Sequence, residues 1–201
     1  MPVVSVVLPT VRGREDLLDQ TRAAFERTTA AAGVDLELVI VRDRPTCGEA
    51  WNDGAQAATG DWLLLGADDL VPHDGWTAVL DDVDRGVWPA PWIVRVDGST
   101  ECCGTLGSGL LLDDRARDGL PVNNSPVPLM RRDTWPRVGP TIPAHCYSDD
   151  FLAWRARAAG LEVEVRRAFK FTHLDGQIGH ARLVARSGAD RQLFAEAVTR
   201  L

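Results

Sequence analysis

The chain has 201 residues, a length typical of a single domain, and its 45% hydrophobic and 25% charged residues are close to the globular average. Twenty-nine acidic side chains against 22 lysines and arginines give a net charge of −7, which disfavours binding to DNA or anionic lipid through bulk positive charge. No apolar run reaches the roughly 20 residues that a membrane-spanning helix needs, and the first residues lack the positive start of a signal peptide. We therefore expect one cytoplasmic domain over residues 1–201 with no membrane span.

The four cysteines, at positions 47, 102, 103 and 146, show no C-x-x-C spacing. In a chain without an export signal, they are expected to be reduced thiols rather than a disulfide framework. Cys102, Cys103, His145 and Cys146 offer zinc as an alternative, although their spacing matches no structural zinc module.

Residues 3–65 show the alternation of strands and helices that is typical of a parallel sheet. Apolar runs at 3–8 and 62–65 indicate strands that are buried in a parallel sheet, and residues 36–41 indicate a further strand between them. Thr46 and Glu49 have the spacing of a capping box and predict the start of a helix between the second and third strands. A first helix over 14–28 is predicted by apolar positions at helical spacing, namely Leu17, Thr21, Ala24, Phe25 and Thr28. This β-α-β-α-β order requires right-handed crossovers.

The second half of the sequence is less regular. We expect a short helix over 75–85, a strand at 92–96, a helix at 148–159, a strand at 161–165 and a terminal helix at 192–201. Residues 97–147 alternate glycine, proline and short apolar pieces without a period, which is typical of functional loops or short antiparallel strands. No repeat or linker divides the chain.

Two adjacent carboxylates, Asp68 and Asp69, follow directly on the strand at 62–65. In open α/β sheets, ligands bind beyond the carboxyl ends of the strands. Carboxylates at that place suit a hard divalent cation, Mg²⁺ or Mn²⁺, that holds a diphosphate. Capping of a helix or turn by one of the two is the alternative interpretation.

Four segments, taken together and in this order, resemble the GT-A glycosyltransferases, and above all their large inverting family 2. They are residues 5–10 with Arg14, residues 39–43, residues 51–63, and the Asp68-Asp69 pair; the likeness recurs near 128–160. The resemblance implies an α/β fold of the GT-A type, with a Rossmann-like, mixed, mostly parallel sheet flanked by helices. It also implies a nucleotide-binding half over 3–96 and an acceptor half over 97–201 that includes the C-terminal helix.

The resemblance implies a nucleotide-sugar donor, UDP- or GDP-linked, whose nucleotide is bound by Pro9, Thr10, Arg14, Asp43, Asn52 and Asp68. Asp43 has an ordinary alternative, because Asp43-Arg44-Pro45 is typical turn sequence. Gly66 stands where the family usually carries the first Asp of its D-x-D motif. The usual carboxylate contact to the ribose is therefore missing from this chain.

The metal site is also implied by the resemblance. Asp68 corresponds to the metal-binding Asp of the D-x-D motif, Asp69 lies beside it, and His173 corresponds to a late histidine that often completes the shell. Neutral imidazole is an acceptable partner to carboxylates on Mn²⁺ or Mg²⁺. His180 is the competing histidine, and a lone histidine is often structural or simply exposed.

Residues 148–155 resemble a helix start of the same family, in which Asp149 is the catalytic base and Asp150 its neighbour. Ser148 and Phe151 stand where the family carries acids. The chemistry agrees, because sugar transfer needs a carboxylate that takes the proton of the acceptor hydroxyl. The alternative is that the helix dipole alone favours two acids at this position.

Together these features predict a metal-dependent inverting glycosyltransferase that moves a sugar from a nucleotide-diphosphate donor to a hydroxyl acceptor. One alternative is a sugar nucleotidyltransferase, although residues 10–14 hold only a faint version of the basic, glycine-rich loop that such enzymes use. Another is a catalytically idle GT-A-like binding or scaffold protein, toward which Gly66 and Ser148 point. Three tryptophans either belong to the core or stack on a sugar ring: Trp88, Trp92 and Trp135.

Overall fold

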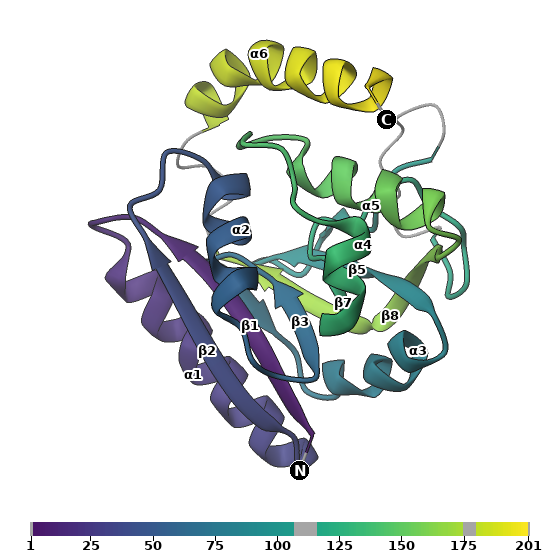
Figure 1. The fold of residues 1–201 in the computed structure, drawn as a ribbon. Coiled ribbons are helices and arrows are strands. Elements are labelled where there is room, and N and C mark those ends of the chain that lie inside the picture. Colours follow the sequence, from purple (N-terminus) through teal and green to yellow (C-terminus); the bar gives the residue numbers. More distant parts are fainter. Residues whose placement is uncertain (1, 107–115, 175–179, 201) are drawn as a thin grey trace.

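The structure, a computed structural model, describes residues 2–106, 116–174 and 180–200, with only the backbone described for 180–186. Two sheets meet in an α/β molecule, and α6 lies along one end of it (Figure 1). In chain order the elements are β1 (Val3–Thr10), α1 (Glu15–Ala32), β2 (Asp35–Arg42), α2 (Cys47–Ala57), β3 (Trp62–Leu65), β4 (Leu70–Pro72), the 3₁₀ turn η1 (Trp76–Val79), α3 (Leu80–Asp84), β5 (Val87–Arg95), β6 (Thr100–Cys102), β7 (Leu129–Arg131), the 3₁₀ turn η2 (Arg132–Thr134), α4 (Trp135–Val138), α5 (Ser148–Ala158), β8 (Glu162–His173) and α6 (His180–Thr199).

The first sheet has the strand order β2-β1-β3-β7. β1 pairs in parallel with β2 from Val3 opposite Asp35 to Thr10 opposite Arg42, and in parallel with β3 on its other side. β7 adds an antiparallel edge along β3. The β-α-β-α-β order predicted for residues 3–65 is confirmed, and the carboxyl ends of three parallel strands meet at one edge of the sheet.

The second sheet has the order β4-β8-β5-β6 and is built from both halves of the sequence. β8 runs parallel to β5 and antiparallel to β4, and β6 pairs antiparallel with the other side of β5. These pairings place the end of β8 beside the segment that follows β3, because His173 lies opposite Leu70.

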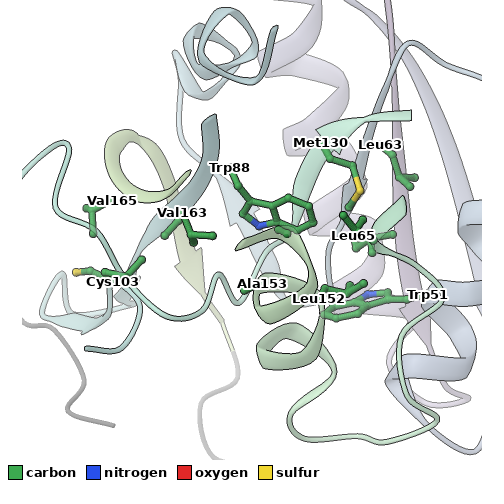
Figure 2. Close-up of a cluster of buried hydrophobic side chains, with 14 of the residues drawn as sticks. Trp51, Leu63, Leu65, Trp88, Cys103, Met130, Leu152, Ala153, Val163 and Val165 are labelled. Carbon is green, nitrogen blue, oxygen red and sulfur yellow. The ribbon is translucent and has the colours of Figure 1, made fainter. Parts of the chain in front are cut away.

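The core has two parts, on the two faces of the first sheet. Val6 and Leu8 of β1 pack toward α1 and Phe25, whereas Val7 packs toward α2. Figure 2 shows the α2 side, where Trp51 lies beside Leu65 and Leu152. On α1 the buried face is Leu18, Thr21, Ala24, Phe25, Thr28 and Thr29, so Leu18 rather than the predicted Leu17 is the buried leucine. No described helix is long and apolar enough to cross a membrane.

Several elements extend beyond the predicted bounds. β5 begins at Val87 rather than at 92. The prediction missed its first residues because prolines disfavour a regular strand, and here the register shifts between Ala90 and Trp92. β8 continues to His173 rather than ending at 165, since its cationic residues have partners in the fold. Arg166 pairs with Asp82 and Glu164, and Arg167 lies over the ring of Trp92. α6 begins at His180 rather than 192.

Candidate functional site

The first acidic group lies just beyond β3, where Asp68 and Asp69 are both buried and both contact Arg14. The Arg14 guanidinium donates to both carboxylate oxygens of Asp68 at 2.9–3.1 Å and to Oδ2 of Asp69 at 2.6 Å. Thr10 at the end of β1 donates its hydroxyl to Oδ2 of Asp68 at 2.7 Å. Thr21 of α1 holds the backbone carbonyl of Asp68 at 2.9 Å. Asp68 is therefore fixed from three directions.

These contacts leave little acceptor capacity on Asp68. Each of its carboxylate oxygens already accepts two hydrogen bonds, which is the usual capacity of such an oxygen. The hydrogen bond to Asp68 outweighs the effect of burial and raises the pKa of Arg14, so the guanidinium stays charged. A cation could reach Asp68 only by displacing Arg14 or Thr10.

Asp69 shares Arg14 with Asp68 and also lies beside His173. Its Oδ2 lies 3.4 Å from Nε2 of His173, and Nδ1 of His173 lies 3.0 Å from Oε2 of Glu101 on β6. The hydrogen bond with Asp69 outweighs burial and, with the charges of Asp69 and Glu101, raises the pKa of His173 to about 9. Burial favours a higher pKa for Asp69, but the hydrogen bond and charge of His173 and the charge of Arg14 hold it below its ordinary value.

Asp69 and His173 are residue types that can ligate a divalent cation, but His173, with its raised pKa, would have to give up a proton to do so. A carboxylate and an imidazole are suitable ligands, and an outer carboxylate such as Glu101 on the far ring nitrogen is the usual support of a ligating histidine. Among the described residues, no three His, Cys, Asp or Glu side chains form a ready-made cage, so diphosphate and water oxygens would have to complete the shell. His180 begins α6, and its side chain lies outside the described residues.

The second acidic group is at the start of α5, where Asp149 and Asp150 occupy the first turn. Tyr147, the residue before this helix, has the left-handed backbone conformation with φ of 66°. Both carboxylates are partly exposed, yet the surrounding protein and the charge of Asp150 raise the pKa of Asp149 above its ordinary value. Burial also raises the pKa of Asp150, and the charge of Arg157 opposes that effect.

One described side chain donates a hydrogen bond to Asp149. Asn124, which is 7% exposed, donates its amide N–H to Oδ2 of Asp149 at 3.4 Å. Its own carbonyl accepts from the Thr105 hydroxyl at 3.2 Å. Arg157 of α5 donates to the backbone carbonyl of Asn123 and so ties this loop to the helix that carries Asp149.

Cys47, the first residue of α2, lies within reach of the charges of both acidic groups. Burial raises the pKa of the Cys47 thiol, and the charges of Asp149, Asp69 and Asp68 raise it further. One side chain thus feels both groups at once, although 79 residues or more separate them in sequence. The fold therefore brings the charges of Asp68, Asp69 and Asp149 to bear on one side chain, Cys47.

Of the other residues predicted to bind the nucleotide, Pro9 and Asp43 lie at the ends of β1 and β2, and Asn52 lies on α2. Asp43 has φ of 55°, its N–H donates to the Thr10 carbonyl at 3.0 Å, and its carboxylate accepts the Arg12 N–H at 3.1 Å. Asp43 therefore shows the turn geometry that its sequence suggests. Asn52 uses its amide to pair with both backbone groups of Thr141, at 2.9 and 2.8 Å. Pro9 is the penultimate residue of β1.

The structure also accounts for Gly66 and for the tryptophans. An ideal Cβ at Gly66 would lie 3.2 Å from Cδ2 of Leu8, so the position is closed to a larger side chain unless its neighbours move. Trp88 and Trp92 are 1% and 4% exposed, and Trp135 packs against the same core cluster. The core interpretation of Trp88 and Trp92 is confirmed.

Glu101 and Asn124 contact candidate site residues, and the sequence pattern does not reveal them. Both lie between 97 and 147, where no helical or strand period is present. Their role depends on contacts across at least 25 residues, to His173 and Asp149 respectively.

No protein-family model and no curated protein matches the sequence. Among solved structures, the catalytic domain of Drosophila β1,4-galactosyltransferase 7, in complex with xylobiose, is similar with a TM-score of 0.60 and 16% identity, covering 90% of this chain and 74% of that one. S. aureus TarS is similar with a TM-score of 0.60 and 10% identity, covering 87% of this chain. The chain spans 37% of that TarS structure and 60% of a TarS structure of residues 1–349. The GT-A glycosyltransferase type of fold, predicted from the motifs, is confirmed.

Proposed function

We propose that this protein is a glycosyltransferase that takes a sugar from a nucleotide-diphosphate donor, UDP- or GDP-linked, and passes it to a hydroxyl acceptor with inversion. The similarity of its fold to two glycosyltransferases supports the class of reaction. The observation that carries the proposal is Asp149, a carboxylate with a raised pKa at the start of α5, whose charge acts on Cys47 together with those of Asp68 and Asp69.

Asp149 is the proposed catalytic base. As the acceptor oxygen attacks the anomeric carbon, its proton passes to the Asp149 carboxylate and the new C–O bond forms. The bond between the anomeric carbon and the diphosphate oxygen breaks, and the nucleoside diphosphate leaves. A single displacement of this kind inverts the anomeric carbon. The raised pKa of Asp149 favours the transfer, because a carboxylate of higher pKa is a better proton acceptor near neutral pH.

Asp69 and His173 are the proposed ligands of Mn²⁺ or Mg²⁺, and Glu101 orients the imidazole of His173. When bound, such an ion would stabilise the negative charge of the departing diphosphate. Asp68 remains a candidate ligand only if Arg14 or Thr10 moves, and in the arrangement described it anchors Arg14. Pro9, Thr10, Arg14, Asp43 and Asn52 remain the proposed contacts for the nucleotide.

We also propose a cytoplasmic location. None of the four cysteines forms a disulfide, which is the expected state in a reducing compartment.

A catalytically idle binding protein is the second candidate, and Gly66 is the observation that favours it. The position that carries the first acid of the D-x-D motif in the family is here a glycine with little room for a side chain. Such a protein would bind the nucleotide sugar without turning it over.

A thermal-shift series separates the candidates. UDP- and GDP-sugars are added with and without Mn²⁺, because a ligand that binds only the native state raises its stability. We expect one donor to raise the Tm only with Mn²⁺ present, and we expect Asp69→Asn to abolish that shift. Asp81→Asn, at an exposed carboxylate of α3, is the control and should keep it.

Release of nucleoside diphosphate by the unmodified chain then distinguishes an enzyme from an idle protein. Slow hydrolysis of the stabilising donor supports the glycosyltransferase, whereas stabilisation without release supports the idle protein. If no donor shifts the Tm under any condition, both candidates are wrong.

A further inference from the structure

The segment that precedes the Asp149 helix is held at several points by neighbouring elements. Thr141 pairs with Asn52 of α2 through both its backbone groups, and Ala144 accepts the backbone N–H of Gly48 at 2.9 Å. The Ser148 hydroxyl donates to the Ala144 carbonyl at 2.8 Å. α2 thus fixes the first part of the segment, over residues 141–144.

α6 fixes the second part. Asp190 of α6 is 7% exposed, and one of its carboxylate oxygens, Oδ2, accepts the backbone N–H groups of His145 at 3.0 Å and Cys146 at 2.9 Å. Hydrogen bonds from N–H groups to an ionised carboxylate are among the stronger ones in proteins. They cross 44 and 45 residues of sequence.

Aromatic rings add a second contact between α6 and α5. The ring of Phe194 stacks on Tyr147 with 5.9 Å between centroids, and meets Phe151 of α5 edge-on at 6.5 Å. Figure 1 shows α6 lying over the end of the molecule that carries α5. α6 therefore contacts residues on both sides of Tyr147: His145 and Cys146 before it and Phe151 after it.

That turn leads directly into the first turn of α5, which carries the acidic pair. Tyr147 has a left-handed backbone, which few non-glycine residues adopt without help from their surroundings. His145 and Cys146, held by Asp190, lead directly into it, and Asp149 follows two residues later. If the two N–H groups were released, Tyr147 would be free to relax, and the first turn of α5 would change its direction.

We propose that Asp190 is a positioning residue for sugar transfer, which holds the 145–147 turn so that the Asp149 carboxylate is aimed at the acceptor hydroxyl. The inference rests on the proposed function, since it gives α6 a part in that reaction. The hydrogen bonds of Asp190 within the described residues go to backbone N–H groups of the turn, and Asp190 takes no part in the bond changes.

The test compares Asp190→Ala with Asp190→Asn, using the full chain with Mn²⁺ and the donor found by the thermal-shift series. In Asp190→Ala we expect turnover to fall by about 10²-fold, the effect of a misplacement of about 1 Å. The affinity for the donor should stay within about twofold, because the contacts described for Asp69 and Arg14 are with Asp68, His173 and each other. Asp190→Asn keeps a carbonyl oxygen that can accept both N–H groups and should recover most of the turnover.

Two further variants control for folding. Glu196→Ala changes another acid of α6, one that contacts only Gln192 and Arg200 among the described side chains, and should leave turnover unchanged. If Asp190→Ala does not fold, Phe194→Leu loosens the same turn through Tyr147 and should lower turnover by about tenfold with unchanged donor affinity. Hydrogen exchange at residues 145–149 should quicken in Asp190→Ala but not in Asp190→Asn.

Wild-type turnover in Asp190→Ala, or equal losses of turnover and donor affinity, would overturn the inference and leave the proposed function standing. A wild-type protein that turns over no donor would overturn the proposed function and the inference with it.

Discussion

Replacing Arg14 with alanine should destabilise the protein strongly at neutral pH. Arg14 makes four hydrogen bonds of 2.6–3.1 Å to Asp68 and Asp69, whose side chains are 6% and 12% exposed. Removing one partner of a buried ion pair leaves charge without compensation and costs about 3–5 kcal/mol. For a domain of this size, that loss corresponds to a fall in Tm of about 6–20 °C.

The loss should depend on pH in a defined direction. Asp69 has a lowered pKa in the folded state, because the effect of burial is outweighed by His173 and Arg14. A group of this kind stabilises the fold above its unfolded pKa of about 3.9, and the contribution disappears as the pH falls through the folded value. Without Arg14 this contribution shrinks. The difference in free energy of unfolding between wild type and Arg14→Ala should therefore be large at pH 7 and should disappear as the pH falls below about 4.

Urea unfolding at pH 7 and at about pH 2.5, well below the unfolded pKa of Asp, measures the effect, with Arg22→Ala as the matched control. Arg22 lies on the same helix and pairs only loosely with Asp19 and Glu26, at 3.6 and 3.7 Å, with half its side chain exposed. Its loss should cost less than about 1 kcal/mol. Equal losses in the two variants, or a difference between wild type and Arg14→Ala that widens toward the lower pH, would refute the reasoning.

Two further stability predictions follow from the same structure. Because the pKa of His173 is raised to about 9, wild type should be more stable than His173→Gln below about pH 6.5 and should lose that advantage as the pH rises through 9. A difference in the free energy of unfolding by urea that does not change with pH would contradict this. At Gly54 an ideal Cβ would lie 2.2 Å from Cγ1 of Val7, so Gly54→Ala should cost about 1–3 kcal/mol in urea unfolding. Gly188→Ala, where nothing lies within 4 Å, should instead gain up to about 1 kcal/mol, and equal effects of the two would count against the packing described.

The first half of the fold was predictable because its signals are local. β-branched runs and helical spacing define β1, α1, β2, α2 and β3 without reference to the rest of the chain. The single misplaced residue on α1, Leu17 for Leu18, is an error of one position on a helical face. The short apolar run of β3, which follows Gly60, can be recognised as a buried strand from its own residues.

The second half was not predictable to the same extent, because partners distant in sequence decide its structure. Prolines at 89 and 91 argue against a strand until the bulge in β5 is known. Arg166 and Arg167 are unfavourable in a buried strand on the sequence alone. In the structure Arg166 pairs with Asp82, and Arg167 lies over the ring of Trp92.

The candidate site divides in the same way. Asp68, Asp69 and Asp149 stand in recognisable motifs and lie in the two acidic groups of the structure. Sequence alone does not separate the roles of Asp68 and Asp69, because that depends on which of them Arg14 and His173 contact. Asn124 and Asp190 have no local signal, since each acts through a contact with a distant backbone or side chain.

The most direct test of the proposed reaction compares Asp149→Asn with Asp150→Asn in turnover and in donor affinity. Both amides are close in size to the acids they replace, and successive positions on a helix point about 100° apart. The account predicts that Asp149→Asn binds the donor like wild type but turns over about 10²–10⁴-fold more slowly. Asp150→Asn should lose much less turnover. The acid limb of its pH–rate profile should move to lower pH, because the charge of Asp150 helps to raise the pKa of Asp149. Wild-type turnover in Asp149→Asn would contradict the account.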